Sequence, residues 1–164
     1  MTTIAEAAAV RSILIAGTGN IFLGDDAFGV EVARKLASRE WPEGVRAVDF
    51  GIRGFDLAFA MLEGVDLTIF VDATPRGGTP GTLYLIEPDT SNLSAHVDAH
   101  SMNPLAVMQL VKTMGGEFRR LLVVGCEPER CDQGIGLSAS VEGALDRAVA
   151  MIEELVRKEM EESL

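Results

Sequence analysis

The stretch SILIAGTGNIFLGDDAFG, residues 12–29, decides the fold of this chain. Its first five residues form a short apolar run that ends at Gly17, which is typical of a strand buried inside a sheet. From about Asp26 to Ser38 the apolar residues follow a helical spacing, with charged residues on the opposite side. A buried strand that leads directly into such a helix is the repeating unit of a parallel sheet covered by helices.

The rest of the chain repeats this alternation. Strands are predicted at residues 45–50, 67–72, 82–86 and 120–125, and helices at residues 54–62 and 103–113 and in one long final helix with an apolar stripe from Val141 to Val156. The short 82–86 strand is expected at an edge of the sheet. The pattern predicts an α/β protein, a three-layer sandwich whose mainly parallel, twisted sheet carries helices on both faces. Because neither a linker nor a repeat interrupts it, residues 1–164 are predicted to form a single domain.

Composition narrows the choice of partners and compartment. The net charge is −11, from 25 acidic against 14 basic residues, so the surface repels phosphate backbones and no nucleic acid is expected as a partner. No apolar run approaches the ~20 residues needed to cross a bilayer, and the first 11 residues lack the features of a signal peptide. Cys126 and Cys131 fit neither a redox nor a zinc motif and are predicted to be unpaired thiols. We therefore expect a cytoplasmic protein, and we also expect it to be a monomer.

Three polar segments are predicted to meet at one edge of the sheet, because ligands of such folds collect beyond the carboxyl ends of the strands. These segments carry Asp26, Asp72 and His100. Each residue alone has an ordinary explanation, as a first-turn helix residue, a turn-forming aspartate and a loop histidine. Together, two carboxylates and an imidazole suit Zn²⁺, Ni²⁺ or Fe²⁺, and three ligands leave coordination positions open for a substrate. The sequence therefore predicts an open metal site.

A dinucleotide site is the competing interpretation of the first segment. Gly17 and Gly19 directly after a strand would let the backbone approach a pyrophosphate. However, a dinucleotide fingerprint needs its third glycine where Phe22 stands, and the carboxylates of Asp25 and Asp26 would repel the phosphates. The details oppose nucleotide binding.

At these residues the sequence resembles the hydrogenase maturation endopeptidases over most of its length, from about Ser12 to Leu155. The most specific motif is G-x-G-N-x-x-x-x-D-[DE]-x-x-G, which is matched here by Gly17, Gly19, Asn20, Asp25, Asp26 and Gly29. The family's second acidic residue follows the third strand in a V-D-A context, residues 71–73 here, and its histidine, His100 here, precedes a helix. Two weaker motifs follow, G-x-x-P-E at residues 125–129 and G-L-S at residues 136–138.

The resemblance implies a specific activity. Members of this family remove a short C-terminal extension from the large-subunit precursor of nickel–iron hydrogenases after nickel has been inserted. Asp26, Asp72 and His100 match the residues thought to grip the nickel that the substrate carries, so that metal insertion licenses cleavage. Nickel is thus expected to arrive with the substrate, and other divalent transition metals could bind in its place.

The sequence departs from the family at two places. Asp26 stands where many members have Glu, which draws the carboxylate back by roughly 1.5 Å. After the second strand, residues 49–56 read DFGIRGFD in place of the usual D-G-G-T-x-G. Gly51, Arg53 and Gly54 of this segment are predicted to bind the substrate. Arg53 could contact carboxylates or the C-terminus of the client, or it could be a solvated loop arginine.

The sequence leaves the mechanism of peptide hydrolysis open. A metal ion could polarise the scissile carbonyl or lower the pKa of a water, or it could only position the bond while a carboxylate acts as base. Asp25, Asp26 and Asp72 are all candidate bases, whereas Cys126 at a strand end has no evident base beside it. A non-catalytic metal-sensing chaperone that docks on the hydrogenase subunit is the alternative from another functional class, and a nucleotide-binding enzyme is a further one.

Overall fold

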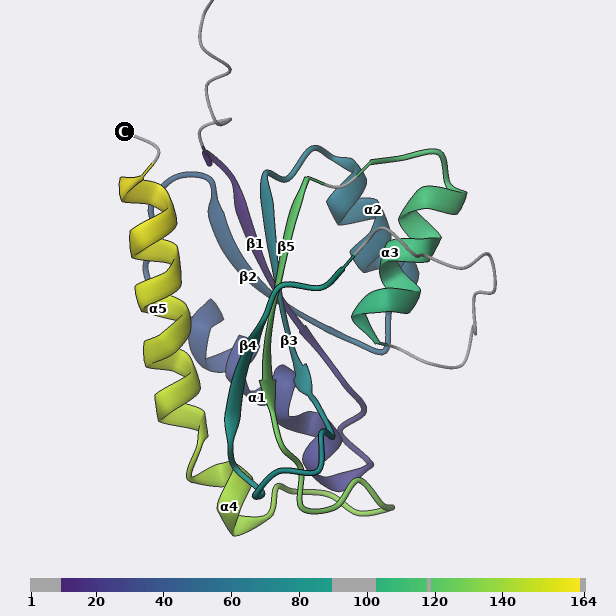
Figure 1. The fold of residues 1–164 in the computed structure, drawn as a ribbon, viewed down its shortest axis with the longest axis vertical. Helices are drawn as coiled ribbons and strands as arrows, with labels where there is room; N and C mark the ends of the chain where they lie inside the picture. Colours follow the sequence, from purple (N-terminus) through teal and green to yellow (C-terminus); the bar gives the residue numbers. More distant parts are fainter. Residues whose placement is uncertain (1–9, 90–102, 118, 163–164) are drawn as a thin grey trace, which may run out of the picture.

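The protein folds around one five-stranded sheet (Figure 1). The computed structural model describes residues 10–89, 103–117 and 119–162. The strand order is β2-β1-β3-β5-β4, and all neighbouring strands are parallel except β4, which pairs antiparallel with β5 at one edge. The strands are β1 Ile13–Thr18, β2 Val45–Gly51, β3 Leu67–Ala73, β4 Leu83–Ile86 and β5 Arg120–Cys126.

Helices cover both faces of this sheet, so the predicted three-layer α/β fold is confirmed. One apolar cluster joins α1 and α5 to one face, and a second joins α2 and α3 to the other, as Figure 1 shows for α5 and the α2–α3 pair. The helical elements are the 3₁₀ turn η1 Gly24–Ala27, α1 Phe28–Ala37, α2 Gly54–Leu62, α3 Pro104–Thr113, α4 Ala139–Glu142 and α5 Leu145–Glu161. No helix in the described parts of the chain is long and apolar enough to cross a membrane.

Two helix boundaries differ from the sequence prediction. The helix expected from Asp26 begins only at Phe28, because residues 24–27 form a 3₁₀ turn whose N–H groups are drawn to another loop, from Gly24 to Gly134 and from Asp25 to Arg130. The final helix is divided into α4 and α5, since the chain turns between them at residues 143–144. Short-range periodicity cannot reveal either break.

Two glycines of the first motif let α1 lie unusually close to the sheet. A Cβ atom added to Gly17 would lie 2.2 Å from the carbonyl oxygen of Gly29, and one added to Gly29 would lie 2.0 Å from that of Val71. Both distances are far below van der Waals contact, so no larger residue fits without moving the helix. This close packing fixes the position of the loop that precedes α1.

The strand order places a topological switch point next to β1, at the carboxyl ends of β1 and β3, and we call this region the crevice because open α/β sheets have one there. The chain passes from β1 to β2 on one side and then crosses to β3 on the other side of β1. The connections therefore diverge beyond the carboxyl ends of β1 and β3, which is where open α/β sheets bind their ligands. Asp26 follows β1 and Asp72 lies near the end of β3, so the topology brings both to this crevice.

Candidate active site

Asp72 is a buried carboxylate with few partners. Its side chain is 6% exposed, and its Oδ1 accepts the N–H of Ala73 at 2.9 Å. Burial raises the pKa of Asp72 well above its ordinary value, and the negative charge of Asp26 raises it further. A carboxylate in this environment is stabilised by any cation that reaches it.

Asp26 is the second carboxylate of the crevice and is half-buried. Its Oδ2 accepts the backbone N–H of Asn20 at 2.8 Å, while the side-chain Oδ1 of Asn20 accepts the N–H of Phe22 at 2.9 Å. Asn20 therefore shapes the turn that orients Asp26. Because Asp26 and Asp72 lie close enough to repel each other, the two carboxylates form an anionic pair that suits a divalent ion.

Thr18 places an unsatisfied hydroxyl in the same crevice. Gly17 pairs with Val71 in the β1–β3 ladder, so the next residues, Thr18 and Asp72, lie at neighbouring strand ends. The Thr18 hydroxyl opposes the rise in the pKa of Asp72, but its geometry falls short of a hydrogen bond, and Oγ1 is the one fully buried side-chain N or O atom in the described residues that lacks a partner. An unsatisfied buried hydroxyl beside the Asp72 carboxylate fits a site that binds a ligand.

Asp25, next to Asp26 in sequence, has a structural role. It is fully buried, and its carboxylate accepts the N–H groups of Glu129, Arg130 and Ser138 at 2.7–3.1 Å and the Ser138 hydroxyl at 2.8 Å. Burial alone would raise the pKa of Asp25, but these hydrogen bonds outweigh it and leave the pKa below its ordinary value. Asp25 thus clamps the loop after β5 to the turn after β1, with every bond reaching across more than 100 residues of chain.

Glu127 supports the loop that follows Asp72, a role that the sequence did not reveal beyond its place in a weak motif. Its Oε1 accepts the N–H groups of Arg76 and Gly78 at 2.9 and 2.8 Å and the hydroxyl of Tyr84 at 2.7 Å. The hydrogen bond from Tyr84 is the main cause that lowers the pKa of Glu127. A single buried carboxylate therefore orders the loop at the end of β3.

Neither cysteine has the properties of a nucleophile. Burial and then the charge of Asp25 raise the pKa of Cys126 to about 11. Partial burial and then the charge of Asp26 raise the pKa of Cys131, an exposed residue, also to about 11. At neutral pH roughly one thiol in ten thousand is then ionised. Both thiols are free, as predicted.

The third predicted ligand, His100, lies outside the described residues, as does His96. Among residues 10–89, 103–117 and 119–162 no group of three His, Cys, Asp or Glu side chains could hold a metal ion. The described part of the crevice thus supplies Asp26 and Asp72, and the role of His100 remains a prediction.

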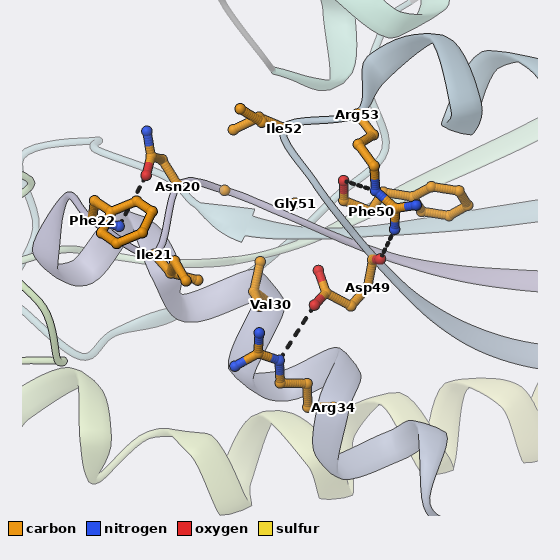
Figure 2. Close-up of a pocket in the computed structure, with 11 residues that line it drawn as sticks. Asn20, Ile21, Phe22, Val30, Arg34, Asp49, Phe50, Gly51, Ile52 and Arg53 are labelled. Atoms are coloured by element: carbon orange, nitrogen blue, oxygen red, sulfur yellow. Dashed lines mark hydrogen bonds and ion pairs between the residues drawn. The ribbon is translucent and has the colours of Figure 1, made fainter.

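The predicted substrate-binding segment lines a pocket of about 310 Å³ beside the crevice (Figure 2). Gly51 and Arg53 contribute to its wall, whereas Gly54, the first residue of α2, is not among its lining residues. The guanidinium of Arg53 is bound internally: it donates to the backbone carbonyls of Asp49 and Phe50 and pairs with Asp56. Arg53 therefore braces the end of β2, while its side chain stays 58% exposed, and its contact with the client remains a prediction.

Comparison with known proteins gives a consistent result. The model of a family described as hydrogenase maturation protease matches residues 30–155. A putative hydrogenase maturation protease of Methanocaldococcus jannaschii is 34% identical over 148 residues, which cover 87% of this chain and 94% of the relative. The hydrogenase maturating endopeptidase HybD from E. coli has a TM-score of 0.74 at 29% identity, over 90% of this chain and 93% of that one. A hydrogenase 2 maturation peptidase from a Thaumarchaeota archaeon has a TM-score of 0.69 at 30% identity, over 88% and 97%.

The fold and the crevice define an α/β protein that presents acidic side chains at the switch point of a mainly parallel sheet. The matches assign it more narrowly: the chain belongs to the hydrogenase maturation protease family, whose role is the C-terminal processing of hydrogenase large subunits. The predicted family is thereby confirmed.

Proposed function

We propose that this chain is an endopeptidase that removes the C-terminal extension of a nickel–iron hydrogenase large-subunit precursor after nickel insertion. Asp26, Asp72 and His100 would grip the nickel that the precursor carries, and other divalent transition metals would compete for the same place. The observation that carries this proposal is the pair formed by a buried, sparsely bonded Asp72 and the half-buried Asp26. A positive ion between them would remove their repulsion, so nickel-loaded precursor would bind better than nickel-free precursor.

In this proposal the nickel is part of the substrate, and the residues of the chain orient it and handle protons. Asp25 is unsuited to act as general base because its two oxygens already accept four hydrogen bonds. Asp26 and Asp72 remain as candidates, and the pKa of Asp72, which burial raises above its ordinary value, makes it the stronger proton acceptor of the two when it is ionised. The hydrolytic water would be delivered between the carboxylates and the scissile carbonyl.

The partner in this proposal is the hydrogenase precursor, and the protein would act as a monomer in the cytoplasm, where the precursor is assembled. The acidic surface, with a net charge of −11, agrees with a protein that has no nucleic-acid partner. The turn after β1 is a 3₁₀ turn that carries two aspartates, and this arrangement also argues against a nucleotide site there.

The decisive experiment is cleavage of purified precursor, with and without nickel. We expect the wild-type protein to shorten only the nickel-loaded precursor. Asp26→Ala, Asp72→Ala and His100→Ala are each expected to lose about 4 kcal/mol of transition-state stabilisation, which slows cleavage roughly 1000-fold. His96→Ala, four residues from His100 and outside the family motifs, is the matched control and should cleave normally.

Three outcomes would overturn the proposal, each in a different way. A stable complex with unshortened, nickel-loaded precursor would favour the metal-sensing chaperone. Normal cleavage by all three alanine variants would leave the peptidase activity standing but would disprove the assignment of the site. Tight nucleotide binding that Asp26→Asn does not disturb would favour the nucleotide-binding enzyme.

A further inference from the structure

The pocket beside the active site is built mainly from apolar side chains. It lies between the loop after β1 and the end of β2, with Val30 of α1 at its base (Figure 2). Ile21 and Phe22 contribute from the loop, and Phe50 and Ile52 contribute from the end of β2. Its volume of about 310 Å³ lies near the lower end of the range for small-ligand sites and has room for one or two side chains.

The charged groups around this pocket are already neutralised. Arg34 pairs with Asp49 at 3.3 Å and with Glu31 at 3.4 Å, and Arg53 pairs with Asp56 at 3.4 Å. An incoming charged group would therefore have to compete with an existing ion pair while losing its own hydration. The pocket favours an uncharged, apolar occupant.

Two large apolar side chains at the pocket face solvent. Phe22 is 59% exposed and Ile52 is 62% exposed, and they project from the two separate segments that form the walls. Single exposed apolar residues are common on protein surfaces, but two that flank an apolar pocket form a surface that a partner can cover. Covering them would add apolar burial to whatever the pocket itself takes up.

The pocket and the active site share one wall. The backbone N–H of Asn20 donates to Asp26, while Asn20 itself lines the pocket. The N–H of Gly19 donates to the carbonyl of Gly51 at 3.0 Å, which joins the loop that carries Asp26 to the end of β2. The loop that carries Asp26 therefore also forms one side of the pocket.

We propose that this pocket is a specificity subsite that takes up a bulky apolar side chain of the client polypeptide close to the bond that is cut. This inference rests on the proposed function and adds the chemical class of the residue that is read. The occupant is a segment of the precursor, because the pocket adjoins the residues that hold the reacting end of that chain. Binding energy gained here would position the scissile bond over the carboxylates.

The test compares exposed apolar residues inside and outside the pocket. Nickel-loaded hydrogenase large-subunit precursor is the probe, and its cleavage is measured as separate kcat and KM values. Ile52→Ser and Phe22→Ser should each raise KM about tenfold with kcat nearly unchanged, since each removes apolar area that the client covers. Leu85→Ser is the matched control: Leu85 is 50% exposed on β4 at the opposite edge of the sheet, and its replacement should leave KM unchanged.

A complementary set of precursor variants identifies the residue that occupies the pocket. In the precursor, each bulky apolar residue near the cleavage site is replaced by Ser, one at a time. One of these replacements should raise the KM of the wild-type protein. The same replacement should cause little further rise in the KM of the Ile52→Ser variant, because the pocket contact is already lost. Unchanged KM values for both Ile52→Ser and Phe22→Ser would overturn the subsite, while cleavage by the wild type would leave the proposed function standing. Failure of the wild-type protein to cleave any precursor would instead overturn the proposed function.

Discussion

Two buried carboxylates near the carboxyl ends of β1 and β3 have opposite environments. Asp25 is fully buried and accepts four hydrogen bonds, which hold its pKa below the ordinary value. Asp72 is 6% exposed, accepts the N–H of Ala73, faces the charge of Asp26, and has a pKa well above the ordinary value. The first carboxylate is stable as an anion without help, whereas the second needs a proton or a cation.

This contrast separates a structural acid from one that we propose to be functional. The hydrogen bonds of Asp25 stabilise the fold by closing a loop. They occupy both carboxylate oxygens, so Asp25 cannot also bind a substrate. Asp72 weakens the fold when it is ionised, and such local destabilisation is common where a protein binds a charged ligand. Asp25 and Asp26 are neighbours in the motif and have the same side chain, but we assign Asp25 a structural role and Asp26 a role in the proposed site.

The largest expected effect is the removal of the structural carboxylate. Asp25→Ala leaves the buried N–H and hydroxyl of Ser138 and two part-buried N–H groups without their acceptor, so we expect a loss of about 4 kcal/mol in the free energy of unfolding. Denaturant titration measures this loss. Asp132→Ala, at an exposed position of the same loop, is the control and should change stability by less than about 0.5 kcal/mol. A similar effect of both variants would contradict the clamp.

The two carboxylates should also differ in their dependence on pH. The folded pKa of Asp25 is lowered, so its contribution to stability is present above the unfolded pKa, about 3.9, and is lost as the pH falls through the lower folded pKa. We expect Asp25→Asn to be less stable than the wild type by about 2 kcal/mol at pH 7, with the difference shrinking below about pH 4. Denaturation of both proteins between pH 3 and pH 8 tests this; a constant difference would show that the charge is irrelevant.

Replacement of Asp72, the proposed functional carboxylate, should change stability in the opposite direction and make the protein more stable. The folded pKa of Asp72 is raised, so its ionisation costs stability, and this cost grows as the pH rises from the unfolded towards the folded pKa. At pH 7 we expect Asp72→Asn to have a free energy of unfolding about 1 kcal/mol above that of the wild type and a melting temperature roughly 3 °C higher. The variant should also lose precursor cleavage. Thermal unfolding followed by circular dichroism measures the shift. A melting temperature below that of the wild type would show that ionised Asp72 does not destabilise the fold.

The smallest effect is expected at the exposed thiol near the crevice. Because its pKa is about 11, Cys131 supplies almost no thiolate at neutral pH. We expect Cys131→Ser to cleave precursor within about twofold of the wild-type rate. If iodoacetamide inactivates the wild type but not Cys131→Ser, the Cys131 thiol has a role in cleavage and this prediction is wrong.

The fold was largely predictable because each element has a local signal. The buried strand at residues 12–16 and the helical periodicity after it already imply the alternation that builds the sheet. The 3₁₀ turn at residues 24–27 was not predictable, since it depends on hydrogen bonds to Arg130 and Gly134, more than 100 residues away. The division between α4 and α5 was likewise hidden under a continuous apolar stripe.

The candidate site was predictable only in part. Asp26 and Asp72 could be selected because each stands at or just beyond the end of a strand and matches a motif, and the topology does bring both to one crevice. The internal bonds of Arg53 could not be foreseen, because a sequence does not say whether a cation faces its own backbone or a partner. The apolar pocket was missed for a related reason: its walls come from separate segments whose residues show no common pattern.

The sequence by itself determined the order of strands and helices, the acidic surface and the side chains available for chemistry, since these follow from local spacing and composition. Tertiary structure alone decided which carboxylate is satisfied and which is exposed to its neighbour's charge. The reason is that a pKa depends on the donors, charges and solvent that surround a group in space, and for Asp25 these come from the far end of the chain.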